Sequence, residues 1–141
     1  MARAFELRMT AEELSDFFVE AFPGDPQRNF IFDRFEPGFL RIKLVPDETM
    51  LRPGELVSGP TQMGLADRAA YAVILAHIGP VAMAVTSNLN MSFLRGVQKE
   101  DVFADATLLK LGRKLASVDV RLWQGEESHI VAQSTVTYAI P

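Results

Sequence analysis

The residue best suited to chemistry is Asp67, a carboxylate inside a long apolar segment. From residue 60 to 78 apolar side chains recur at steps of three and four, which predicts a buried helix. Burying a lone carboxylate is costly unless it is paired or hydrogen-bonded. The adjacent Arg68 points about 100° away on a helix and is a poor partner. Asp67 therefore either faces solvent or has a function.

The start of the same helix offers a second group. Proline is favoured in the first helical turn, so Gly59-Pro60 marks the beginning of the helix. That end presents unpaired N–H groups and the positive end of the helix dipole. Pro60 and Asp67 are about two turns apart and share a face. A group that polarises a carbonyl, together with a base on the same face, suits the hydrolysis of an activated acyl group.

Other nucleophile and metal-ligand patterns are weak. Ser58 is not in a G-x-S-x-G motif, and only His77 or His129 could serve as its base. His77 lies on an apolar stripe near the helix end, which is typical of a core residue or one that stabilises the helix dipole. His129 follows an acidic turn and is expected to be exposed. Two isolated histidines without spaced carboxylates predict no metal site.

Composition narrows the class of protein. A chain of 141 residues with 48% hydrophobic and 23% charged residues fits one globular domain spanning 1–141. The absence of cysteine excludes disulfides and thiolate catalysis and suits the cytoplasm. A net charge of -4 argues against nucleic acid as a partner. The uncharged stretch 69–94 is broken by Gly79-Pro80 and by polar residues, which predicts a buried helix, a turn and a buried strand instead of membrane insertion.

The elements that must position these groups can be predicted from periodicity and punctuation. A capping box of Thr10 and Glu13 predicts a helix over 11–21, which Pro23-Gly24 ends. Alternating residues predict a β-hairpin of 29–35 and 39–45, followed by a loop over 46–54. The central helix ends at Gly79-Pro80.

The rest of the chain is predicted to be β structure. Strands are expected over 81–94, 102–111, 115–123 and 129–140, and short connections make the last three adjacent and antiparallel. One apolar helix beside one antiparallel sheet is an α+β design. Pairing with a second copy would cover the exposed edges and the far face of the helix, which predicts a homo-oligomer, either a dimer or a tetramer.

The run from Ser58 to Asp67 resembles the His-Gly-Gly…Leu-Ala-Asp signature of hotdog-fold acyl-CoA thioesterases, most closely the phenylacetate-pathway (PaaI-like) branch. Residues 86–94 resemble the strand that follows the family's helix, and 110–114 resemble its basic turn. The resemblance spans about residues 51–140 and implies a hotdog fold, in which an antiparallel sheet wraps a long central helix.

The resemblance also implies an activity and roles for three residues. An acyl-CoA is hydrolysed to a carboxylic acid and coenzyme A, without a metal or a redox cofactor. Asp67 matches the general base or nucleophile, and Gly59 matches the glycine whose N–H polarises the thioester carbonyl. Thr86 matches a hydroxyl residue that orients the attacking water from across a dimer interface.

Three positions depart from the family pattern. Ser58 replaces the family's histidine, Pro60 its second glycine and Arg52 an asparagine, and all three are expected to border the substrate. These departures leave open a non-catalytic hotdog protein that binds acyl thioesters or lipids, or a structural module.

Two further parts of a substrate site are expected elsewhere in the chain. The phosphates of coenzyme A are expected to meet a cluster of basic residues that includes Arg95, Arg113 and Lys114. The aromatic residues between Phe30 and Phe39 are candidates to shape an acyl pocket.

Overall fold

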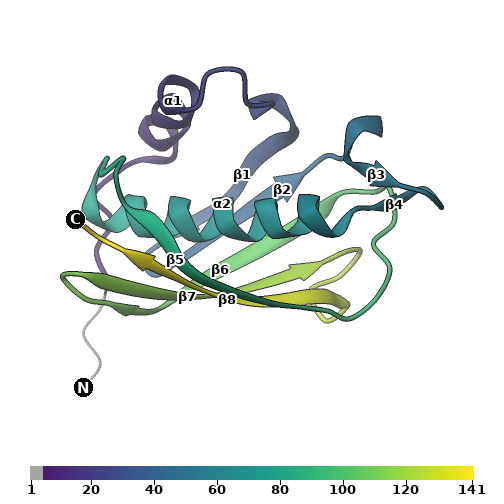
Figure 1. Cartoon of the computed structure of the whole chain (residues 1–141). Coiled ribbons are helices and arrows are strands. Elements are labelled where there is room, and N and C mark those ends of the chain that lie inside the picture. Colours follow the sequence, from purple (N-terminus) through teal and green to yellow (C-terminus); the bar gives the residue numbers. More distant parts are fainter. Residues whose placement is uncertain (1–4) are drawn as a thin grey trace.

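One long helix lies across a six-stranded antiparallel sheet that curls around it (Figure 1). The computed structural model describes residues 5–141. The sheet has the order β1-β2-β6-β7-β8-β5, and β3 and β4 form a separate two-stranded ribbon. The helical segments are α1 (Ala11–Ala21), η1 (Gln27–Asn29), η2 (Glu48–Met50) and α2 (Gly59–Ile78). The strands are β1 (Phe30–Glu36), β2 (Phe39–Leu44), β3 (Leu51–Arg52), β4 (Leu56–Val57), β5 (Val85–Phe93), β6 (Val102–Leu111), β7 (Leu115–Trp123) and β8 (Ile130–Ala139). The predicted α+β class, with a central helix wrapped by an antiparallel sheet, is confirmed.

The short helix α1 has the bounds that its capping box predicts. The Thr10 hydroxyl accepts from the Glu13 N–H at 3.1 Å, and the Glu13 carboxylate accepts from the Thr10 N–H at 2.9 Å. Two otherwise unpaired donors are thereby satisfied at the helix start. Phe17 and Phe18 then bring α1 against Tyr71 of α2.

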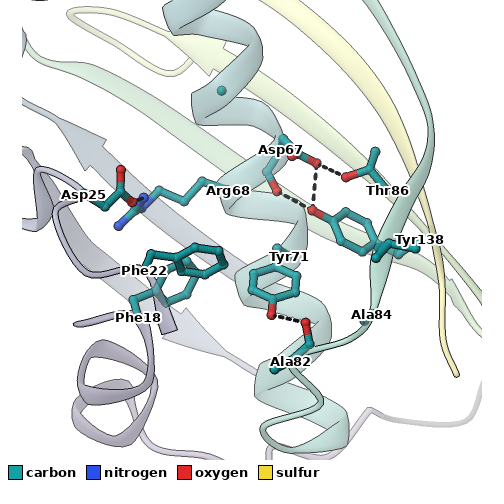
Figure 2. Close-up of a pocket in the computed structure, with 12 residues that line it drawn as sticks. Phe18, Phe22, Asp25, Asp67, Arg68, Tyr71, Ala82, Ala84, Thr86 and Tyr138 are labelled. Atoms are coloured by element: carbon teal, nitrogen blue, oxygen red, sulfur yellow. Dashed lines mark hydrogen bonds and ion pairs between the residues drawn. The ribbon is translucent and has the colours of Figure 1, made fainter. Parts of the chain in front are cut away.

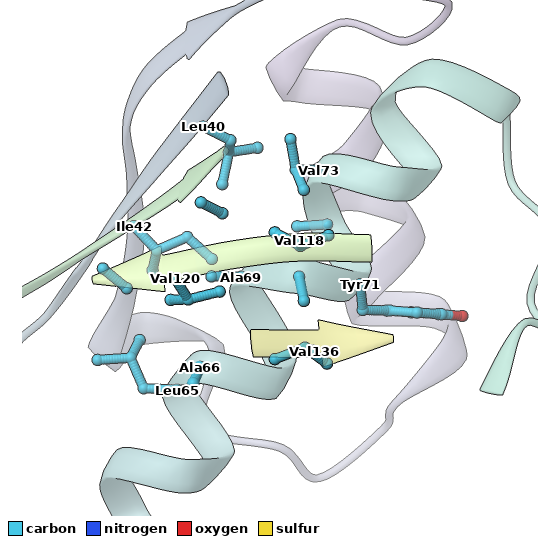
Figure 3. Packing of buried hydrophobic residues seen from close by; sticks show 14 of the residues in the cluster. Leu40, Ile42, Leu65, Ala66, Ala69, Tyr71, Val73, Val118, Val120 and Val136 are labelled. Atoms are coloured by element: carbon cyan, nitrogen blue, oxygen red, sulfur yellow. The ribbon is translucent and has the colours of Figure 1, made fainter. Parts of the chain in front are cut away.

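The core lies between α2 and the sheet (Figure 3). The face of α2 toward the sheet carries small side chains, among them the fully buried Ala66, Ala69 and Ala70. Because these side chains are short, Val118, Val120 and Val136 of the central strands pack directly against the helix. The close approach of helix and sheet places side chains of β8 within reach of α2.

Two loops differ from the sequence prediction. The segment 46–54 is not wholly loop: it contains η2 and β3, because the Asp47 carboxylate accepts from the Thr49 N–H and caps a helical turn. The strand expected from residue 81 begins only at Val85, because residues 81–84 form a turn closed by the Ala84 N–H on the Val81 carbonyl.

The strand after α2 is also not buried as predicted. β5 is an edge of the sheet that pairs only with β8, and most of its side chains are exposed. Val85 and Phe93 near its two ends are about half exposed. Hydrophobicity alone did not reveal this, because a strand's place in the sheet order depends on long-range pairing. The outer side of β5 therefore presents backbone groups to which no strand within residues 5–141 pairs.

The helices within residues 5–141 include none that is long and apolar enough to cross a membrane.

Candidate active site

Asp67 lies at the meeting point of α2, β5 and β8 (Figure 2). Its Oδ1 atom accepts two hydrogen bonds, one from the Thr86 hydroxyl and one from the Tyr138 hydroxyl, both at 2.7 Å. Its Oδ2 atom has no hydrogen-bond partner among residues 5–141. One carboxylate oxygen is therefore fixed, while the other remains available at the edge of a pocket that Asp67 lines.

The two hydroxyl donors come from one cross-strand pair. Thr86 of β5 stands opposite Tyr138 of β8, and a β-bulge follows Thr86, where the register shifts before Asn88. Bulges re-aim neighbouring side chains and are frequent beside active sites. The extra residue Ser87 donates its hydroxyl to the Thr137 carbonyl at 3.2 Å. The β-bulge thus shapes the part of β5 from which the Thr86 side chain points toward Asp67.

Thr86 was expected to orient the attacking water from across a dimer interface, and within this chain its hydroxyl contacts Asp67. The contact arises because β5 returns antiparallel alongside β8, which packs on α2. Asp67 and Thr86 therefore lie together in a single chain.

Tyr138 is the buried member of this group, with only 3% of its surface exposed. Its ring stacks on Tyr71, one helical turn beyond Asp67, with ring centroids 5.6 Å apart. Burial is the main cause that raises the pKa of Tyr138 well above its usual range, and the carboxylate of Asp67 adds to the shift. The phenol is therefore a permanent hydrogen-bond donor at neutral pH.

A pocket of about 400 Å³ opens in front of Asp67. Its aromatic lining is Phe18 of α1, Phe22 directly after it, Tyr71 of α2 and Tyr138 of β8, and none of the residues 30–39, the predicted candidates for an acyl pocket, lines it. Phe18, Phe22 and Tyr71 meet with ring centroids 5.7–5.9 Å apart. Phe30 and Phe32 instead line a separate cavity of about 80 Å³. An apolar pocket beside a carboxylate suits a ligand with an apolar group next to a reactive polar centre.

Arg68 closes one side of this pocket. Its guanidinium pairs with the Asp25 carboxylate and not with Asp67, as helix geometry predicts. The guanidinium also lies over the rings of Phe18 and Phe30, at 4.7 Å and 4.1 Å from their centroids. Arg68 is thus neutralised and stacked, and it ties the segment after α1 to α2.

The start of α2 is built as the sequence predicts, but it is remote from Asp67. The Ser58 hydroxyl accepts from the Thr61 N–H at 3.3 Å and acts as the helix cap, with no histidine bonded to it among the described residues. No hydrogen bond among those residues uses the Gly59 N–H. Gly59 does not line the Asp67 pocket. Asp67 is eight residues after Gly59 on the helix, a rise of about 12 Å.

The predicted basic cluster does not gather in one place. Arg113 and Lys114 form the exposed β6–β7 turn, next to the end of β8 that carries Tyr138, because the Lys114 carbonyl accepts from the Ile140 N–H. Arg95 donates to the Ile130 carbonyl at the opposite end of β8, about 30 Å away along the strand. Arg52 and Pro60 are both exposed, on β3 and in the first turn of α2. Arg95 and Arg113 are near each other in the sequence but far apart in space, because the strand between them, β6, carries the chain to the opposite end of the sheet.

The two histidines agree with their predicted structural roles. His77 is buried, accepts from the Gly38 N–H through Nε2 at 2.9 Å and bonds the Val73 carbonyl through Nδ1 at 2.7 Å. Burial lowers the pKa of His77, so it is a neutral core residue far along α2 from Ser58. His129 is exposed. Among residues 5–141 no cluster of three histidine or acidic side chains could hold a metal ion.

Tyr138, Tyr71, Phe18 and Phe22 were missed in the sequence. One signal could have identified Tyr138: it falls on the inward-facing alternation of β8, together with Ser134 and Val136. A buried tyrosine usually finds a partner for its hydroxyl, and Asp67 is the unpaired carboxylate of the facing helix.

Comparison with known proteins identifies a family whose model matches more than half of the chain. Residues 54–131 match the family model of the thioesterase superfamily. A protein described as a putative thioesterase from Silicibacter sp. TM1040 is 42% identical, with a TM-score of 0.88 over 97% of this chain and 95% of that one. A putative esterase of Thermoplasma acidophilum is 27% identical over 103 residues, which are 73% of this chain and 76% of the relative.

A third comparison concerns the fold alone. A Streptococcus mutans protein whose structure was solved bound to acetyl-CoA is 22% identical, with a TM-score of 0.69 over 80% of this chain and 89% of that one. The α+β architecture, the family match and the 42% identical relative agree, and they support a thioester hydrolase activity. The chain belongs to the thioesterase superfamily.

Proposed function

We propose that the protein hydrolyses acyl-CoA thioesters to a carboxylic acid and coenzyme A, with Asp67 as the group that activates water. The observation that carries the proposal is the asymmetry of the Asp67 carboxylate. Oδ1 is held by two hydroxyl donors, whereas Oδ2 is unbonded beside a pocket of about 400 Å³. A positioned carboxylate of this kind is a suitable general base.

The chemistry follows from this arrangement. The acyl group occupies the aromatic pocket formed by Phe18, Phe22 and Tyr71. Oδ2 takes a proton from water, whose oxygen attacks the thioester carbon, and the carbon–sulfur bond then breaks to release the thiolate of coenzyme A. Direct attack by Oδ2 on the carbonyl carbon would give a short-lived anhydride that water hydrolyses, and it uses the same open oxygen. The acetyl-CoA complex of the Streptococcus mutans relative supports a substrate of the coenzyme A type.

The carbonyl oxygen of the thioester also needs a hydrogen-bond donor, and the candidate, the N–H of Gly59, does not line the Asp67 pocket. The free N–H of Gly59 is about 12 Å along the same helix, too far for both groups to act on one thioester. If two copies pair antiparallel through β5, Phe93 at the end of one β5 comes close to Thr86 at the start of the other, and the Phe93 ring lies beside Gly59 of its own chain. Such pairing would bring the helix start of one copy toward Asp67 of the other. We therefore assign the complete site to a homo-oligomer, with Gly59 of one copy and Asp67 of the other.

The shared site predicts that the active species is at least a dimer. Sedimentation of the protein at micromolar concentration should give a mass of twice 15.6 kDa or more. Dilution that produces monomer should lower the turnover per chain. A monomer that hydrolyses acyl-CoA at full rate would contradict the assignment of Gly59 to a second copy.

The activity itself is tested with a panel of acyl-CoA thioesters of increasing acyl size, by detecting the free thiol of coenzyme A. Turnover on at least one member is the expected result. Tight acyl-CoA binding without thiol release would overturn the proposed hydrolase activity. It would favour a non-catalytic acyl-thioester protein, the alternative that Ser58, Pro60 and Arg52 raise at the family's substrate positions.

The basic turn between β6 and β7 is proposed to hold a phosphate of coenzyme A. Replacing Arg113 and Lys114 by alanine together should raise KM several-fold and leave kcat nearly unchanged, because a phosphate contact is equal in the ground and transition states. Added salt should raise the KM of the parent protein. Arg121→Ala is the control, because Arg121 is exposed, pairs with Asp119 and lies on the outer face of the sheet. An unchanged KM in the double variant would show that the turn is only a solvated rim.

A further inference from the structure

We infer that Tyr138 is a positioning residue for the reaction proposed above: with Thr86 it fixes the plane of the Asp67 carboxylate, so that Oδ2 alone faces the pocket. This inference rests on the proposed function of Asp67. Figure 2 shows the three side chains converging from three different elements.

The geometry supports a clamp with two donors. An ionised carboxylate oxygen has two acceptor sites, and both sites of Oδ1 are occupied, by Thr86 and Tyr138 at 2.7 Å each. The two oxygens of a carboxylate are chemically equivalent. The donors therefore select no special oxygen, but they prevent the carboxylate from rotating and keep one oxygen directed at the pocket.

The two donors differ in rigidity. Thr86 is on the edge strand β5 and is exposed in the single chain. Tyr138 is buried, and its ring is stacked on Tyr71 of α2. Its hydroxyl also lies 3.3 Å from the Asp67 backbone carbonyl. The Tyr138 hydroxyl therefore has a fixed position beside the turn of α2 that carries Asp67. It is the more rigid of the two donors to Oδ1.

Tyr138→Phe is the variant that tests the role, because it keeps the stacked ring and removes only the donor. We expect kcat to fall about 10- to 100-fold, since a hydrogen bond to a charged group is lost, while KM changes less than about twofold. In an Asp67→Asn background the same change should have no further effect, because Tyr138 acts only through Asp67.

A matched control separates positioning from stability. Ser134→Ala removes another buried hydroxyl of β8, which donates to the Asn90 carbonyl of β5 at 2.9 Å and is remote from Asp67. It should lower the melting temperature but leave kcat and KM unchanged. A parent-like kcat for Tyr138→Phe would overturn the inference. So would a loss that persists at full size in the Asp67→Asn background, which would show that Tyr138 acts on the substrate.

A direct measurement distinguishes failure of this inference from failure of the proposed function. At neutral pH the ¹³C signal of the Asp67 side-chain carboxyl should have a different chemical shift in Tyr138→Phe than in the parent, because the hydrogen bond from the phenol is lost. If this difference is seen while no acyl-CoA is hydrolysed by the parent, the clamp exists and the hydrolase assignment fails. If the parent is active and the chemical shift is the same in both proteins, the clamp is refuted.

Discussion

Asp67→Asn is expected to lower kcat by about 10²–10⁴-fold, the usual contribution of a positioned general base. Asparagine has the same shape, and its amide oxygen still accepts from Thr86 and Tyr138. The amide nitrogen then occupies the position of Oδ2, where it cannot take a proton from water. KM and the melting temperature should change little, because neither the pocket wall nor the packing is altered. Steady-state kinetics on the best acyl-CoA of the panel measure the effect.

Two further variants test whether Asp67, and not Thr86 or Ser58, is the residue that activates water. Thr86→Ala should cost less than Asp67→Asn, since Tyr138 still holds Oδ1. Ser58→Ala should cost least, because Ser58 is a helix cap and transfers no proton. If Ser58→Ala abolished turnover while Asp67→Asn retained it, the protein would be a serine hydrolase and the assignment of Asp67 would be wrong.

Arg41→Ala is expected to have the largest effect on stability, lowering the free energy of unfolding by about 2–4 kcal/mol. Arg41 of β2 is 7% exposed and makes two hydrogen bonds to Asp105 of β6, at 2.6 Å and 3.0 Å. It also bonds Glu127 at 2.7 Å and lies 4.9 Å over the ring of Trp123. Removing Arg41 leaves the partly buried Asp105 without its partner, which is why the cost exceeds that of a surface pair.

The neighbouring Arg34 provides the control for this measurement. Its pair with Glu36 is about half exposed, although its guanidinium also lies over Phe39, at 5.2 Å. Arg34→Ala should therefore cost less than about 1 kcal/mol. Urea denaturation of both variants decides the matter: equal, small losses would show that the Arg41 network contributes no more than a surface ion pair.

Local signals predicted the helices and most strand bounds. The capping box of Thr10 and Glu13 and the Gly59-Pro60 and Gly79-Pro80 pairs act within a few residues, so they can be recognised without knowing the fold. Asp67 could also be singled out, because an uncompensated carboxylate in an apolar helix is costly wherever the helix packs. The same reasoning could not show that β5 is an edge strand, because strand order is set by long-range pairing.

The remainder of the site depended on distances across the chain. Tyr138 lies 71 residues after Asp67, and it is brought there by the pairing of β8 with β7 and β5 and by the packing of β8 on α2. The Phe18 and Phe22 side chains enter the pocket because α1 packs on Tyr71, a contact that no local pattern specifies. Arg95 and Arg113 show the reverse: they are near in sequence, and the antiparallel sheet places them at opposite ends.

Part of the pocket wall comes from α1 and the segment after it, whereas the carboxylate and its two donors come from α2, β5 and β8. The segment that matches the superfamily model, 54–131, contains Asp67 and Thr86, whereas Phe18 of α1 and Phe22 directly after it lie outside this segment. Exchange of these two side chains would alter the pocket wall while the Asp67 carboxylate and its two hydroxyl donors remain present. Under the proposed function, substrate preference could therefore change through this short segment without replacement of the residue that activates water.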